Sequence, residues 1–220
     1  MKAIETIYNG YRFRSRLEAR WAVFFDVLGI KYQYELEGYE TKITGEDGNI
    51  EKTIRYLPDF YLPDTRTFVE VKGNLSKNDA YKMEQILDYG SPLPHFDGSY
   101  DFKENLYVGY RPGLLILGEI PCVDWGIVLH KFVTHRKGLW FGHAVFFNSR
   151  WLHLVNETSA NLINLFSGDN EIEEPLSNGN FEPETKYLST KLANAKVVQA
   201  YKTARQARFE FGENKKINAA

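Results

Sequence analysis

An almost wholly apolar run, GLLILGEIP over residues 113–121, most constrains the fold of this chain. A short run without polar alternation is typical of a strand that is buried on both faces of a sheet. The elements expected before it follow the order helix, three strands, helix, which favours a mixed α/β core over a helix bundle or a β-sandwich. The three strands expected before it lie at 30–36, 53–62 and 67–72.

Two helices are indicated by apolar spacing and by capping residues. Over 15–28, apolar side chains recur at helical spacing, and Gly29 follows as a stop signal. Ser76 offers an N-cap for a second helix, with Asp79 in its first turn. We expect that helix to end near residue 89, because two prolines follow.

The second half of the chain has a different pattern. Aromatic and β-branched segments, separated by turn signals over 125–155, predict an antiparallel meander. The segment 167–184 is acidic and rich in Gly, Asn and Pro, which is typical of a mobile connector. A final helix with basic residues near its end is expected over 186–211. The chain therefore divides into two expected domains, a core of residues 1–120 and a β-rich extension of residues 121–220.

Composition limits the classes of partner and compartment. With 220 residues, 43% of them hydrophobic, the chain is long enough for one sizeable core. A net charge of −2 gives no global attraction to nucleic acid, so such binding needs a local basic patch. Cys122 is the single cysteine, which excludes an intrachain disulfide and favours a reducing compartment. No stretch approaches the ~18–20 apolar residues of a membrane span, so we expect a cytoplasmic protein without membrane contact.

The segment YLPDFYLPDTRTFVEVKG, residues 56–73, predicts a hairpin that brings two acids together. A turn centred between Asp64 and Thr65 would place Asp59 directly opposite Glu70. Carboxylates in such a pair have Cβ atoms about 5 Å apart and destabilise a sheet unless a positive charge lies between them. Oxygen ligands select hard cations, so we expect Mg²⁺ at this point, with Mn²⁺ as a substitute.

Strand alternation adds a lysine to the same face of the hairpin. Lys72 lies two residues after Glu70, while Val69 and Val71 should turn toward the core. In phosphodiester hydrolysis the ammonium group could orient or deprotonate the attacking water or stabilise developing charge, while the metal polarises a phosphoryl oxygen. The backbone carbonyl of Val71 could supply another metal ligand.

Two motifs in this arrangement resemble a known family. PD at 58–59, followed by ten residues and then EVK at 70–72, is similar to the signature of the PD-(D/E)XK nuclease superfamily. FRSRLEARWA at 13–22 resembles the first motif of a phage and bacterial branch of that superfamily. The expected element order also matches its restriction-endonuclease-like αβββαβ core, here followed by an antiparallel β extension and a C-terminal helix.

The resemblance implies an activity and assigns roles to residues. Asp59 and Glu70 would hold the metal, Lys72 would assist the water, and Glu18 on the first helix would complete the site. The implied function is that of a metal-dependent endonuclease, phage-encoded or carried by a mobile element, with DNA as its substrate and RNA left open. A homodimer would let two such sites address the two strands of a duplex.

Seven basic residues and one glutamine near these motifs are candidates for nucleic-acid contacts, with solvated helix faces as the alternative. Some flank Glu18 on the first helix, others lie on the second helix, and the rest lie near the end of the final helix. The candidates are Arg14, Arg20, Lys77, Lys82, Gln85, Lys202, Arg205 and Arg208.

Other interpretations of the acidic residues stay open. Glu18 follows Ser15 in an S-x-x-E pattern, so it could cap the helix by reaching back to the Ser15 amide. Glu70 and Lys72 could form an exposed ion pair of negligible worth. The competing function is a catalytically inactive nuclease-fold module that binds nucleic acid or a host protein, for instance as an inhibitor of a host system.

Overall fold

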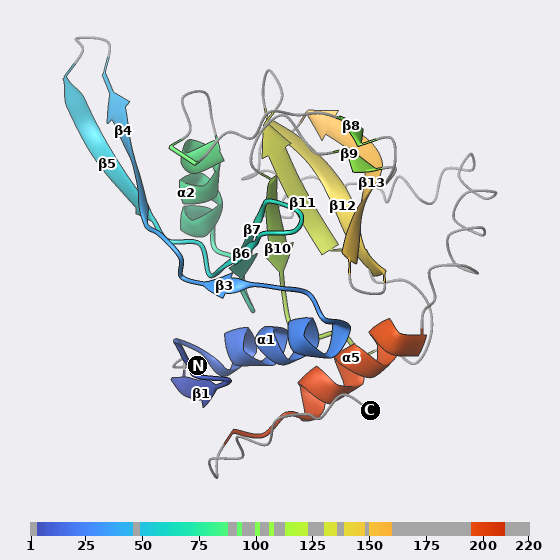
Figure 1. The fold of residues 1–220 in the computed structure, drawn as a ribbon. Coiled ribbons are helices and arrows are strands. Elements are labelled where there is room, and N and C mark those ends of the chain that lie inside the picture. Colours follow the sequence, from blue (N-terminus) through green and yellow to red (C-terminus); the bar gives the residue numbers. More distant parts are fainter. Residues whose placement is uncertain are drawn as a thin grey trace.

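The computed structural model describes residues 4–45, 49–87, 92–93, 100–101, 106–107, 113–122, 130–135, 139–147, 150–159 and 195–209. In these residues a mixed α/β fold is built around a seven-stranded sheet with the order β13-β12-β11-β10-β7-β6-β3 (Figure 1). Its strands are β3 (Gln33–Tyr34), β6 (Phe60–Leu62), β7 (Thr67–Val71), β10 (Gly113–Leu117), β11 (His130–His135), β12 (Leu139–Phe147) and β13 (Arg150–Ser159). The described helices are α1 (Arg16–Leu28), α2 (Lys77–Leu87) and α5 (Ala195–Gln206). Smaller hairpins pair β1 (Thr6–Tyr8) with β2 (Tyr11–Phe13), β4 (Tyr39–Thr44) with β5 (Ile50–Tyr56), and β8 (Tyr100–Asp101) with β9 (Leu106–Tyr107).

The parallel pair β7 and β10 forms the centre of the sheet, and every residue of both strands is buried. Alternate residues face opposite layers. Val69 and Leu115 pack into the core cluster with α1 and α5, whereas Phe68 and Leu114 pack into the cluster with α2. In Figure 1, α1 and α5 lie together below the sheet and apart from α2. The predicted strand with two buried faces is therefore confirmed.

Both predicted helix starts are confirmed by their caps. At the start of α1 the Ser15 hydroxyl accepts the Glu18 N–H at 3.1 Å, and Gly29 ends the helix in the left-handed region with φ 73°. At the start of α2 the Ser76 hydroxyl accepts the Asp79 N–H at 3.2 Å, while the Asp79 carboxylate accepts the Ser76 N–H at 3.1 Å. The Ser15 and Ser76 caps thus accept hydrogen bonds from first-turn amide groups that have no partner within the helix.

The strand expected over 53–62 is instead two strands in different sheets, so its predicted extent is wrong. β5 pairs with β4 in an arm that projects from the body (Figure 1), whereas β6 joins the main sheet. Pro58 lies between them and has no N–H group for a strand ladder. Where β4 ends and β5 begins, the Gly45 N–H donates to the Asn49 carbonyl at 2.9 Å.

The predicted meander is confirmed in β11, β12 and β13, which pair antiparallel in sequence order. β11 also pairs with β10, so residues before and after position 120 share one sheet. The final helix is confirmed over 195–206. Residues 207–209 are not helical, so the end expected at 211 is wrong. The first expected turns, like the acidic connector over 167–184, lie outside the described residues.

A buried polar pair joins the meander to α5. His130 on β11 is buried, and its Nε2 atom forms a hydrogen bond with the Tyr201 hydroxyl at 2.6 Å. Aromatic rings enclose the pair: Trp21 lies 5.4 Å from the His130 ring, and Phe24 stacks on Tyr201 at 4.5 Å. Burial lowers the pKa of His130 to about 3, so the imidazole is neutral in the folded protein.

We expect His130 to make the fold sensitive to mild acid. The unfolded chain takes up a proton near pH 6.5 and the folded chain does not, so stability is full above that pH and falls as pH decreases. Wild type should lose about 1 kcal/mol of unfolding free energy per pH unit below pH ~6, relative to His130→Gln. Urea unfolding of both proteins from pH 7.5 to 5 measures the difference, and parallel pH profiles would contradict the assignment.

Candidate functional site

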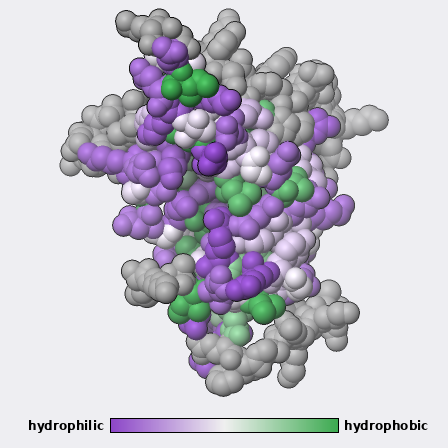
Figure 2. Space-filling model, turned by 90° about the vertical axis from the view of Figure 1, so that its left-hand side faces the viewer, coloured by the Kyte–Doolittle hydropathy of each residue, from purple (hydrophilic) through white to green (hydrophobic). Residues whose placement is uncertain are grey.

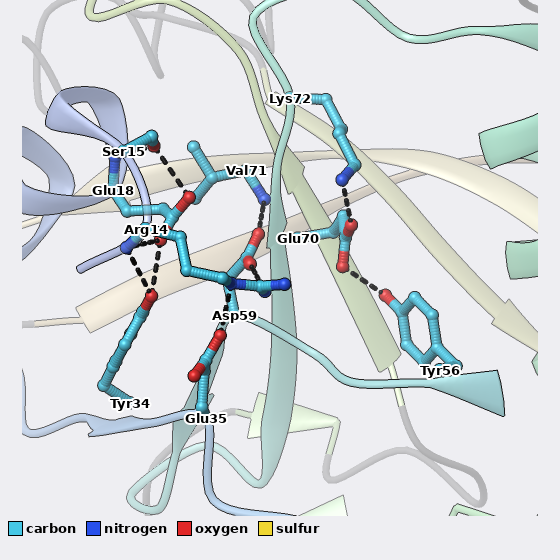
Figure 3. A network of polar contacts seen from close by, with 10 residues as sticks. All are labelled: Arg14, Ser15, Glu18, Tyr34, Glu35, Tyr56, Asp59, Glu70, Val71 and Lys72. Atoms are coloured by element: carbon cyan, nitrogen blue, oxygen red, sulfur yellow. Dashed lines mark hydrogen bonds and ion pairs between the residues drawn. The ribbon is translucent and has the colours of Figure 1, made fainter. Parts of the chain in front are cut away.

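The register of β6 and β7 is the one predicted from the turn. Phe60 pairs with Val69, and Leu62 pairs with Thr67. Continued by one residue, this register sets Asp59 against Glu70. The two carboxylates therefore belong to facing positions at the same end of the two strands, and in the view of Figure 3 they lie on either side of the β7 ribbon.

Asp59 is 2% exposed, and both of its oxygens have protein partners (Figure 3). Oδ2 accepts the Val71 N–H at 2.7 Å, and Oδ1 accepts Arg14 Nη2 at 2.9 Å. Burial raises the pKa of Asp59 to about 8, and the charges of Glu70 and Glu18 act in the same direction. The Asp59 carboxyl group is therefore costly to ionise even with the Arg14 guanidinium group beside it.

Glu70 is 4% exposed and lies between a cation and a hydroxyl group. Oε1 pairs with Lys72 Nζ at 2.9 Å, and Oε2 accepts the Tyr56 hydroxyl at 2.7 Å. Burial raises the pKa of Glu70, although Lys72 and Tyr56 stabilise its charged form. Burial lowers the pKa of Lys72, but the charge and hydrogen bond of Glu70, together with the charges of Asp59 and Asp79, outweigh this effect, and the net pKa is raised.

The predicted placement of Lys72 beside Glu70 is confirmed. The alternative of an exposed ion pair is wrong, because the Glu70 side chain is 5% exposed and that of Lys72 is 32% exposed. Val69 and Val71 point into the core cluster of α1, as expected from strand alternation. The Val71 amide holds Asp59, and a role for the Val71 carbonyl as a metal ligand stays a prediction.

Glu18 is buried at the start of α1 and takes part in its cap. Its Oε1 accepts the Ser15 hydroxyl at 2.7 Å, and its Oε2 accepts the Tyr34 hydroxyl at 2.6 Å and the Arg14 N–H at 3.1 Å. The capping interpretation is thus correct in kind, although the amide belongs to Arg14 and not to Ser15. The charge of Glu18 still acts on Asp59, so the two acids are electrostatic neighbours.

Glu35 and the ion pairs of Arg14 were not predicted from the sequence. Arg14 pairs with Asp59 and, through its Nε, with Glu35. Glu35 has φ 45°, in the left-handed region, and its N–H donates to the Asp59 carbonyl at 2.9 Å. β3 ends directly before Glu35, and the strand expected over 30–36 is shorter than predicted, because only Gln33–Tyr34 form it. Glu35 lies at a polar position of an alternating segment, so the pattern indicated only a solvated side chain.

The other nucleic-acid candidates fall on two sides of the sheet. α2 carries Lys77, Lys82 and Gln85 and packs on the cluster that includes Tyr56. Arg20 lies on α1, which packs against α5. Lys202 and Arg205 lie on α5, and Arg208 follows α5 as an exposed residue. The structure does not gather all of these residues at one point, and their contacts with nucleic acid stay a prediction.

The donor chemistry of the site fits a hard divalent cation in part. Asp59 and Glu70 offer carboxylate oxygens from facing positions, and burial raises the pKa of both groups. Among the residues that the structure describes, however, no group of three or more His, Cys, Asp or Glu side chains is arranged to hold a metal ion. Protein donors engage oxygens of both acids instead.

In comparisons with protein-family models, curated proteins and solved structures, no significant match to this chain was found. Within the described parts of the chain, every helix is too short or too polar to cross a membrane.

We expect the Tyr56 hydroxyl to be needed for the buried charge of Glu70. Tyr56→Phe removes the donor to Oε2 and leaves a buried carboxylate oxygen without it, which should lower the unfolding free energy by about 1–3 kcal/mol. Urea unfolding at pH 7 measures the change. Tyr39→Phe, which removes a hydroxyl from a partly exposed residue of β4, is the control. Equal effects of the two substitutions would contradict a specific role for the Tyr56–Glu70 bond.

Proposed function

We propose that this chain is a metal-dependent nuclease that hydrolyses phosphodiester bonds, with DNA as its substrate. The observation that carries the proposal is the facing pair Asp59 and Glu70, buried at one end of β6 and β7 with Lys72 beside it. Two buried acids in this register destabilise a fold that has no use for them. The similarity of the PD and EVK motifs to the PD-(D/E)XK superfamily gives the arrangement its reaction class.

In this proposal the acids hold the metal and the lysine serves the water. Asp59 and Glu70 would bind Mg²⁺, for which Mn²⁺ can substitute, and Glu18 would complete the site from the start of α1. The metal would supply charge neutralisation at a phosphoryl oxygen. The raised pKa of Lys72 favours a protonated ammonium group that orients the water or stabilises developing negative charge over one that accepts its proton.

The preference for DNA rests on the motif resemblance and on cationic side chains near the acids. The superfamily that the motifs resemble consists mostly of deoxyribonucleases, which favours DNA. Phosphate contacts would come from cationic side chains around the acids, such as half-exposed Arg14 and Lys77 and Lys82 on α2. A homodimer that cuts both strands stays part of the proposal.

The second candidate is an inactive nuclease-fold module that binds nucleic acid or a host protein. The ion pair between Arg14 and Asp59 is the observation that favours it. A protein cation held permanently at Asp59 would replace the metal, and the acids would then have a structural role only. The two candidates differ in whether removal of Glu70 changes chemistry or only stability.

The test is a cleavage assay on supercoiled, linear and branched DNA and on single-stranded RNA, with Mg²⁺, Mn²⁺ or chelator. We expect cleavage that depends on the metal and falls at least about 100-fold in Glu70→Gln and in Lys72→Met, because each removes a charged group beside the reacting phosphate. Glu40→Gln is the matched control, since Glu40 lies on the β4–β5 arm and pairs with Arg55. Absence of cleavage on every substrate with either metal, together with unchanged nucleic-acid binding by Glu70→Gln, would favour the inactive module.

A further inference from the structure

Arg14 brings a positive charge into the acidic site from the chain just before α1. Its backbone is fixed, because its N–H donates to Glu18 Oε2 at 3.1 Å and to the Tyr34 hydroxyl at 3.0 Å. Its guanidinium group reaches Asp59 Oδ1 at 2.9 Å through Nη2, and its Nε pairs with Glu35 (Figure 3). One side chain thus connects the most buried acid of the site with an acid outside the nuclease-like motif.

Glu35, which pairs with Arg14, has an unusual backbone conformation. Its backbone has φ 45°, which is unfavourable for a residue with a side chain, and its N–H is bonded to the Asp59 carbonyl at 2.9 Å. Strained backbone persists where the surroundings require it and is frequent at functional sites. Here the strained residue is linked to Asp59 twice, through its own backbone and through Arg14.

The two ends of the Arg14–Asp59 pair differ in their freedom to move. The Asp59 side chain is 3% exposed, and the Arg14 side chain is 54% exposed. Asp59 therefore cannot reach another cation by moving into solvent, whereas the guanidinium group can leave toward water at little cost. The pair with Glu35 would keep a displaced guanidinium group close to the site.

We propose that Arg14 is an internal counter-ion of Asp59, held beside it by Glu35, and that a divalent cation must displace it from Asp59 in order to bind. This inference rests on the proposed function for the identity of the competing cation. Arg14 then lowers metal affinity and stabilises the metal-free fold.

The experiment measures Mn²⁺ binding by titration calorimetry at pH 7.5 and thermal unfolding in chelator, neither of which depends on activity. Arg14→Met should bind Mn²⁺ about tenfold more tightly than wild type and should unfold at a lower temperature in chelator. Arg12→Met is the matched control, because Arg12 is an equally charged residue whose exposed side chain pairs with Glu5. It should change neither quantity. Arg14→Lys, which cannot form the same forked contacts, should give an intermediate affinity and serves if Arg14→Met fails to fold.

The outcomes separate this inference from the proposed function. Wild type that binds Mn²⁺ with the same affinity as Arg14→Met, or more tightly, would overturn the counter-ion role and leave the metal site intact. If wild type, Arg14→Met and Arg14→Lys all bind no more Mn²⁺ than Glu70→Gln does, the metal site fails and the inference fails with it. Binding by the Arg14 variants without detectable binding by wild type would support the counter-ion role in its strongest form.

Discussion

The facing of Asp59 and Glu70 in the register of β6 and β7 is the constraint on which the site depends. Two buried carboxyl groups at adjacent strand ends repel each other, and burial disfavours the charge on both. Three neighbouring groups stabilise the charges of the two acids: the Val71 amide contacts Asp59, and the Tyr56 hydroxyl and the Lys72 ammonium contact Glu70. Arg14 adds the second full positive charge.

The rest of the fold holds this register in place. β7 is buried on both faces and pairs with β6 on one side and β10 on the other, so a one-residue slip would bring Val69 and Phe68 into the wrong layers. The cap of α1 fixes Glu18 and the Arg14 amide at the edge of the sheet. The register of β6 and β7 thus places both the core side chains and the acids, and the acids lie at one end of these two strands.

Local patterns were sufficient to predict some parts and not others. The start of α1, the β6–β7 register and the buried strand β10 follow from capping residues, turn position and apolar runs, which act over a few residues. The contacts of Tyr56, Glu35 and Arg14 could not be predicted in this way, because they join β5, the end of β3 and the segment before α1 through tertiary packing. Tyr56 belongs to an apolar pattern, and Glu35 occupies a polar position that is usually solvated. Neither residue lies in a sequence pattern that distinguishes a site residue from an ordinary strand residue.

The pH dependence of unfolding, measured in chelator for wild type and Asp59→Asn, shows whether Asp59 is a buried acid with a raised pKa. The pKa of Asp59 is raised to about 8 in the folded protein from about 4 when unfolded, so wild type loses stability as pH rises through this window. We expect the unfolding free energy of Asp59→Asn, relative to wild type, to increase from pH 5 to pH 8.5. A difference that stays constant or decreases over that range would mean that Asp59 is already well compensated, and would contradict a buried acid that requires a further cation.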